Sequence, residues 1–199
     1  INWNDFSKLS KVTPIITSVY PNGEADINDF HKYGGTSYLM KELYQNGLIH
    51  NDIKTINENE FKDYTKRAEE KNGVIIYKNS SKTPLNRKIL RTVKKPFSPQ
   101  GGIKLISGNI GKGIVKISSV MEKHQKICEQ AEVFENPEEF NEAFKKGALN
   151  KDCIVVIRNQ GPQSNGMPEL HSLNPILSVI QNLGYKIALI TDGRMSGAS

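Results

Sequence analysis

CIVVIRNQG, residues 153–161, carries the clearest fold signal in the sequence. Its unbroken apolar run, mostly of β-branched residues, is typical of a strand buried on both faces. The glycine that follows is typical of a loop leaving the end of that strand. On either side, AEVF (131–134) and YKIALIT (185–191) are similar apolar segments, and we predict a strand in each.

A helix is predicted between each pair of these strands. Asn136 and Pro137 read as an N-cap followed by an N1 proline, and Gly147 reads as the stop. A second apolar-periodic segment runs from about Pro175 to Leu183. Strand, helix, strand, helix, strand in succession predicts an α/β layer with some parallel pairing.

A segment rich in residues that break secondary structure divides the chain upstream of these strands. KPFSPQGG (95–102) is dense in Pro and Gly and marks a boundary, which predicts domains at 1–95 and 96–199. Beyond it, strand-like Ile103–Ile106 and Ile114–Val120 are joined by SGNIGKG (107–113), which we interpret as a β-turn or bulge.

The first third is predicted to be helical and rich in loops. Thr36 reads as the N-cap of a helix that Asn46-Gly47 ends. A second helix is predicted from about Asn59 to Lys71, and the residues 74–77 then read as a short strand.

Composition bounds the class of protein. With 37% hydrophobic and 24% charged residues the chain is globular, and no apolar stretch approaches the ~20 residues of a membrane span. Cys128 and Cys153 form no CxxC pattern or disulfide framework, which favours a reducing, cytoplasmic context. The net charge of +6 is spread thinly, with Lys94-Lys95 and Lys145-Lys146 as the densest clusters, so a solvated surface is favoured over nucleic-acid binding.

Two glycine-bearing loops follow predicted strands, at 158–171 and 191–199, and we expect them to share a crevice at the carboxyl ends of those strands. In the first, Glu169 is a suitable oxygen ligand for Mg²⁺, or simply an acid in the first turn of a helix. His171 is either a general acid or base or an ordinary surface residue.

The second loop brings an anion, an anion-binding fork and a hydroxyl together in Asp192, Arg194 and Ser196. A serine hydroxyl is a poor base or nucleophile until a neighbouring metal or base lowers its pKa. No histidine lies nearby in sequence, so a hydrolase triad is unsupported.

The motifs GPQSNGMPELHSL (161–173) and ALITDGRMSGAS (188–199) together resemble the paired signatures of the dihydroxy-acid and phosphogluconate dehydratase family. Within these motifs, the sequences NGMPELH and GRMSGAS are similar to those of the phosphogluconate branch of the family. The resemblance extends over consecutive blocks, so it covers essentially the whole chain; these blocks are VYPNGEADINDFHKYGG (19–35), GGIKLISGNIGKGIVKISSV (101–120) and VFENPEEFNEAFKKGAL (133–149).

This resemblance implies a reaction and a fold. The reaction is elimination of water from 6-phospho-D-gluconate, a phosphorylated sugar acid, to give 2-dehydro-3-deoxy-6-phospho-D-gluconate in the Entner–Doudoroff route. The fold is the helical end of a large N-terminal domain at 1–95, followed by a truncated, swivelling, barrel-like β/α domain at 96–199. The chain is then one segment of a longer enzyme, expected to be a homodimer with no nucleic-acid or membrane partner.

The resemblance also implies cofactors and residue roles. Glu169 matches a ligand of a divalent cation, expected to be magnesium, and Ser196 matches the catalytic base. Arg194 and Asp192 are expected to bind substrate, although Arg194 is equally able to pair with Asp192 or a neighbouring loop. The ligands of an iron–sulfur cluster, expected to be 4Fe-4S, lie outside this chain. The 199 residues alone are therefore expected not to catalyse the dehydration.

Other residues receive no role in this comparison. Cys128 and Cys153 do not match cluster positions and read as small, mostly buried residues. His31 lies in a well-matched block without an assigned function. A related sugar-acid or dihydroxy-acid dehydratase remains an alternative, as does a non-catalytic basic interaction module.

Overall fold

The predicted strand at 153–157 forms as β6 (Cys153–Ile157), the central strand of a three-stranded sheet. It pairs in parallel with β5 (Ala131–Phe134) on one side and with β7 (Ile187–Thr191) on the other. The β6–β7 register aligns Cys153 with Ile187 and Ile157 with Thr191. The two strands therefore end together, and the loops that follow them leave the same edge.

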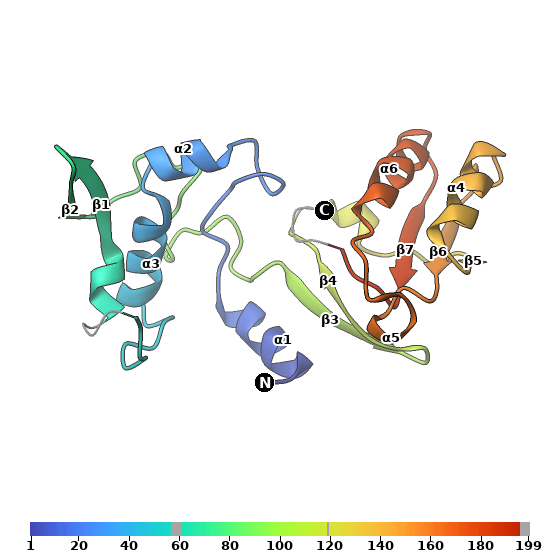
Figure 1. The fold of residues 1–199 in the computed structure, drawn as a ribbon, viewed down its shortest axis with the longest axis horizontal. Helices are drawn as coiled ribbons and strands as arrows, with labels where there is room; N and C mark the ends of the chain where they lie inside the picture. Colours follow the sequence, from blue (N-terminus) through green and yellow to red (C-terminus); the bar gives the residue numbers. More distant parts are fainter. Residues whose placement is uncertain (57–60, 119, 196–199) are drawn as a thin grey trace. The chain divides into compact units, whose positions relative to one another are not determined.

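Two helices pack on this sheet (Figure 1). α4 (Pro137–Lys145) begins as predicted, because the side chain of Asn136 accepts a hydrogen bond from the backbone N–H of Glu139. α6 (Asn174–Asn182) follows β6. Both helices cover the same face, since their buried residues join alternate residues of β6 in one core; this core comprises Phe140, Leu149, Cys153, Val155, Ile157, Leu170, Leu173, Ile180 and Ile187.

The structure is a computed structural model that describes residues 1–56, 61–118 and 120–195. The chain forms two compact units, Ile1–Ser119 and Val120–Ser199. The second unit also holds three short helical turns, which are η2 (Glu122–His124), α5 (Pro162–Asn165) and η3 (His171–Leu173). The first unit ends at Ser119, whereas the domain boundary was expected near residue 96, and that domain boundary stays a prediction.

The first unit contains α1 (Trp3–Val12), α2 (Ile27–Lys32) and α3 (Gly35–Gln45), as expected for a helical and loop-rich segment. Its small core joins α2 and α3 to a later loop, and consists of Phe30, Tyr38, Ile89 and Leu90. The α3 helix begins without a side-chain cap at Gly34, so the prediction of Thr36 as its N-cap was wrong. Gly34 approaches Tyr38 so closely that an added Cβ atom would lie 2.9 Å from the Cβ of Tyr38.

The helix predicted from Asn59 to Lys71 is wrong from residue 61 onward, and residues 59 and 60 lie outside the described residues. Phe61–Thr65 is a 3₁₀ turn (η1), and β1 (Lys66–Lys71) pairs antiparallel with β2 (Val74–Asn79). Asn72 and Gly73 have φ values of 54° and 76°. This pair of positive φ angles makes the tight hairpin turn for which Asn-Gly is the strongest short signal, rather than a helix stop.

A second hairpin confirms the turn expected in SGNIGKG. β3 (Ile103–Gly108) and β4 (Gly111–Lys116) are antiparallel, and Gly108 pairs with Gly111 across the turn. The second strand is shorter than predicted, since it ends at Lys116. The α/β class is confirmed at the level of mixed helices and small sheets, and none of the sheets in the described ranges closes into a barrel.

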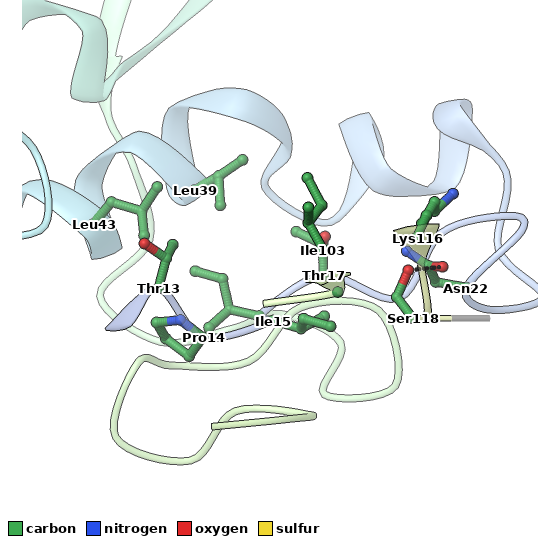
Figure 2. Close-up of a pocket in the computed structure, with 12 residues that line it drawn as sticks. Thr13, Pro14, Ile15, Thr17, Asn22, Leu39, Leu43, Ile103, Lys116 and Ser118 are labelled. Atoms are coloured by element: carbon green, nitrogen blue, oxygen red, sulfur yellow. Dashed lines mark hydrogen bonds between the residues drawn. The ribbon is translucent and has the colours of Figure 1, made fainter. Parts of the chain in front are cut away.

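A cavity of about 330 Å³ lies within the first unit (Figure 2). Leu39 and Leu43 line its apolar part, and Ser118 donates a hydrogen bond of 2.8 Å to Oδ1 of Asn22 at its polar part. Glu169, Asp192 and Arg194 do not line it, so it is separate from the site predicted from the loops. None of the described helices has the length and apolar character that crossing a membrane requires.

Candidate active site

The candidate site lies at the carboxyl edge of the parallel sheet, within the second unit. The loops that follow β6 and β7 meet there through hydrogen bonds, an ion pair and an isolated parallel bridge between Glu169 and Arg194. The two glycine-bearing loops therefore meet at one edge of the sheet, and the crevice expected between them stays a prediction.

Asp192, the first residue after β7, binds the backbone of the loop after β6. Its Oδ1 accepts a hydrogen bond of 2.9 Å from the N–H of Gln160, and its Oδ2 accepts one of 3.2 Å from the N–H of Gly161. Both carboxylate oxygens are thus directed at main-chain donors. A carboxylate held between two N–H groups fixes one loop against the other, because charge-assisted hydrogen bonds are stronger than neutral ones.

Gly193 brings the two loops into close backbone contact. A Cβ atom at this position would lie 2.8 Å from the Cβ of Gln160 and 3.1 Å from Cδ1 of Leu170. Real Cβ atoms do not approach that closely, so the contact requires glycine at residue 193. The packing against Leu170 places the residue before it, Glu169, beside the segment that carries Arg194.

Gln160 anchors the first loop from inside. It is 2% exposed, its Nε2 donates to the carbonyl oxygen of Arg158 at 3.1 Å, and its Oε1 accepts from Nδ2 of Asn165 at 3.1 Å. A buried amide with both ends bonded holds its surroundings in one arrangement. Gln160 was not predicted as a site residue, because nothing in the neighbouring sequence distinguishes it from a surface loop glutamine.

Glu169 and Arg194 form an ion pair. Nη1 of Arg194 donates to Oε2 of Glu169 at 2.8 Å, and Oε1 of Glu169 accepts the N–H of His171 at 3.1 Å. Arg194 therefore pairs with the neighbouring loop and not with Asp192, whose oxygens accept from Gln160 and Gly161, and its binding of substrate stays a prediction. His171 is the first residue of η3, whose first turn holds no acidic residue, so the alternative role of Glu169 as an acid in the first turn of a helix is wrong.

The backbone between Gln160 and Glu169 is strongly bent. Gly166 and Met167 both have positive φ, at 65° and 57°, and the N–H of Met167 donates to the carbonyl oxygen of Gly161 at 3.3 Å. A positive φ is uncommon for a residue with a Cβ atom. These turns return the chain to the sheet edge, where Glu169 meets the β7 loop.

A third group at this edge was missed by the sequence analysis. Glu135, which follows β5, accepts hydrogen bonds from the guanidinium of Arg158 and from Nδ2 of Asn159, the latter at 2.8 Å. The hydrogen bond to Glu135 raises the pKa of Arg158 above its already high ordinary value. Such a cluster has no sequence signal, because Glu135 and Arg158 are brought together only by the pairing of β5 with β6.

The remaining predicted residues are placed as follows. Ser196, the predicted base, lies outside the described residues. His31 belongs to α2 in the first unit. Cys153 is buried as expected, and burial raises the pKa of its thiol, whereas Cys128 is exposed, so the expectation that both are buried was wrong for Cys128.

The implied metal groups fit this part of the chain unequally. Across residues 1–56, 61–118 and 120–195, no three His, Cys, Asp or Glu side chains lie close enough together to hold a metal ion. The two cysteines therefore do not fit an iron–sulfur cluster. Glu169 does fit a divalent hard cation as one carboxylate ligand, because magnesium uses only one or two protein carboxylates.

Comparisons with known proteins agree with the motif resemblance. Residues 88–199 match the family described as dihydroxy-acid/6-phosphogluconate dehydratase C-terminal, and residues 1–64 match its N-terminal counterpart. The chain is 43% identical over 199 residues to the phosphogluconate dehydratase of Pseudomonas aeruginosa and 46% identical over 200 residues to that of Zymomonas mobilis. Each alignment covers 100% of this chain and 33% of the relative.

A relative from the other branch is more distant. The dihydroxy-acid dehydratase of Prochlorococcus marinus is 33% identical over 203 residues, which cover 100% of this chain and 34% of the relative. The chain thus spans about a third of the length of the curated relatives it matches.

Proposed function

Because the chain belongs to the dihydroxy-acid/6-phosphogluconate dehydratase family, we propose that the protein eliminates water from 6-phospho-D-gluconate to give 2-dehydro-3-deoxy-6-phospho-D-gluconate. The observation that carries the proposal is an identity of 43% and 46% to two phosphogluconate dehydratases, against 33% to a dihydroxy-acid dehydratase. The protein is then a hydro-lyase of the Entner–Doudoroff route, acting in the cytoplasm.

The reaction sets clear chemical demands. The proton on C2 lies alpha to a carboxylate and is only weakly acidic, so its removal needs a positioned base and positive charge near that carboxylate. Removal of the C2 proton and loss of the C3 hydroxyl group as hydroxide leave a double bond between C2 and C3. The resulting enol then takes up a proton at C3 and becomes the 2-keto product.

Within this chain, we assign the base to Ser196 and a cation ligand to Glu169. Both assignments come from the family resemblance. The convergence of the 158–171 loop with the segment preceding Ser196 supports them, since Glu169 pairs with Arg194 only two residues before that serine. A magnesium ion held by Glu169 would supply positive charge beside the substrate carboxylate.

Arg194 is the residue we propose to bind an anionic group of the substrate. Its planar fork suits a carboxylate or a phosphate, and its side chain is 49% exposed, so it is accessible from solvent. It now neutralises Glu169, and a cation on Glu169 would compete with the guanidinium for the same carboxylate. Asp192 was also predicted to bind substrate, but its two oxygens face backbone N–H groups.

An iron–sulfur cluster is a further proposed cofactor, with its ligands outside this chain. Cys128 is exposed and Cys153 is buried in the core of the second unit, and neither belongs to a group of three or more His, Cys, Asp or Glu side chains among the described residues. We therefore expect the 199 residues by themselves not to turn over.

The family also suggests the larger architecture. We propose that residues 1–95 end a large N-terminal domain and that 96–199 belong to a swivelling β/α domain, in a homodimer. The match of residues 1–64 to the N-terminal family domain and of 88–199 to the C-terminal one supports this division. The parallel sheet with α4 and α6 on one face suits a β/α domain.

The test is an assay of the full-length protein on 6-phosphogluconate beside gluconate and a branched-chain 2,3-dihydroxy acid. We expect turnover to be fastest on 6-phosphogluconate, with the keto product measured directly. Faster turnover of either non-phosphorylated acid would favour a related sugar-acid or dihydroxy-acid dehydratase, which the identity of 33% to that branch keeps as the second candidate.

A non-catalytic basic module is less well supported. Several lysines pair with carboxylates, for example Lys66 with Asp63 and Lys151 with Glu132. RNA binding that weakens steeply with salt would support this alternative.

A further inference from the structure

Two aspartates connect β6 and β7, one at each end of the pair. Asp152, which precedes β6, accepts the N–H of Lys186, which precedes β7, at 2.8 Å. Asp192, which follows β7, accepts the N–H groups of Gln160 and Gly161, which follow β6. The same type of bond therefore joins the same two strands at the amino edge and at the carboxyl edge.

Only the carboxyl-edge connection lies next to the candidate active site. Asp192 holds the backbone of Gln160 and Gly161, and the adjacent Gly193 packs against Gln160 and Leu170. Leu170 is preceded by Glu169, whose backbone bridges that of Arg194. The carboxylate of Asp192 thus fixes the contact that brings Glu169 and Arg194 side by side.

The charge of Asp192 argues against its direct contact with the substrate. The proposed substrate carries a carboxylate and a phosphate, and a second carboxylate nearby repels both. The two backbone donors instead bind one oxygen each, so both oxygens of Asp192 are directed at the protein backbone.

We propose that Asp192 is a positioning residue of the dehydratase site, which sets the alignment of Glu169 with Arg194 and does not bind substrate. The claim that this is a dehydratase site rests on the proposed function. The claim that Asp192 aligns Glu169 with Arg194 rests on the hydrogen bonds alone. Asp152 is its counterpart without a role in the site.

The experiment compares Asp192→Ala with Asp152→Ala in the full-length holoenzyme, and includes Asp192→Asn in case the alanine variant does not fold. Steady-state kinetics on 6-phosphogluconate separate kcat from KM, thermal unfolding reports stability, and backbone amide hydrogen exchange without substrate reports the loops. The exchange measurement needs no turnover, so it stays informative even if 6-phosphogluconate is not the substrate.

We expect the Asp192 variants to lower kcat by about tenfold to a hundredfold, because a small misplacement of catalytic groups has effects of that size. KM is expected to rise by no more than about threefold, because Arg194 keeps its guanidinium although its alignment with Glu169 is lost. The amides of Gln160, Gly161 and His171 exchange faster in the Asp192 variants. In Asp152→Ala the amide of Lys186 exchanges faster instead, with kcat retained.

Three results would overturn the inference. A KM raised about tenfold with kcat retained would make Asp192 a substrate contact. Equal losses of kcat in the Asp152 and Asp192 variants would make its role one of general stability. Unchanged exchange at His171 would separate Asp192 from Glu169. If the wild-type holoenzyme does not turn over 6-phosphogluconate, the proposed function fails, and faster exchange at His171 in the Asp192 variants alone still supports the positioning role.

Discussion

Nη1 of Arg194 lies 2.8 Å from Oε2 of Glu169, and this ion pair between residues 25 positions apart in sequence joins two loops. The pair sits where the loops after β6 and β7 meet, with side chains that are 49% and 35% exposed. An ion pair with that much solvent access contributes at most about 1 kcal/mol to folding. The pair therefore contributes little to stability, and we propose that its importance lies in what the two side chains bind.

Replacing Arg194 tests whether its guanidinium binds substrate. We expect Arg194→Lys in the full-length protein to raise KM for 6-phosphogluconate by about tenfold, because lysine keeps the charge but loses the bidentate fork. The melting temperature is expected to stay unchanged, as the ion pair is exposed. Arg158→Lys is the matched control, since Arg158 also pairs with a carboxylate at this sheet edge but with Glu135. An equal rise of KM in both variants would contradict a specific role for Arg194.

Replacing Glu169 tests its proposed role as a cation ligand. Glu169→Gln keeps the shape and removes the charge, and we expect Kd for Mn²⁺, used in place of Mg²⁺ and followed by electron paramagnetic resonance, to rise by about tenfold or more. The measurement is independent of turnover. Glu138→Gln, on an exposed residue in the first turn of α4, is the control and should leave Kd unchanged. Unaltered Mn²⁺ binding in Glu169→Gln would limit this carboxylate to pairing with Arg194 and His171.

Gly193 offers a test of how tightly the two loops pack. In Gly193→Ala the new methyl group would meet the side chain of Gln160 at 2.8 Å, so the loops must separate. We expect a loss of about 1–3 kcal/mol in the free energy of unfolding, the usual cost of overpacking, measured by urea denaturation. Gly108→Ala is the control, because its Cβ atom would meet no atom within 4 Å. A loss below about 0.5 kcal/mol, the size of an ordinary surface effect, would mean that the loops yield freely.

The local sequence predicted the part of the fold that positions the site. The Asn136 cap and the apolar run of β6 are signals contained within a few residues, and both elements form as expected. The helix expected up to Lys71 failed because Asn72-Gly73 ends a helix and turns a hairpin with the same residues. The pairing of β1 with β2 across that turn decides between the two.

The site itself was predictable only in part. Strand order brings the loops after β6 and β7 to one edge, so the meeting of the two loops follows from the topology, whereas the pairing of Glu169 with Arg194 does not. The partners of Asp192 do not follow, because a carboxylate two residues from an arginine is as well suited to an ion pair as to two backbone N–H groups. Gln160 became visible only once its burial and its two hydrogen bonds were known.

The burial of Tyr38 predicts how the stability of the first unit changes at alkaline pH. Its side chain is fully buried, its hydroxyl has no hydrogen-bond partner in the described part of the chain, and burial together with the nearby charge of Glu42 raises its pKa to about 12. Because the folded-state pKa lies above the unfolded value of about 10, the contribution of Tyr38 to the free energy of unfolding is fully present below pH ~10 and is lost as pH rises toward 12.

Tyr38→Phe removes the unpaired hydroxyl, so we expect the variant to be at least as stable as the wild type at pH 7. We also expect it to lose less stability between pH 10 and 12, measured by urea denaturation across that range. Tyr77→Phe, on a residue that is 67% exposed, should follow the wild-type pH dependence. A Tyr38→Phe curve parallel to the wild-type curve up to pH 12 would mean that the phenol of Tyr38 does not titrate with unfolding.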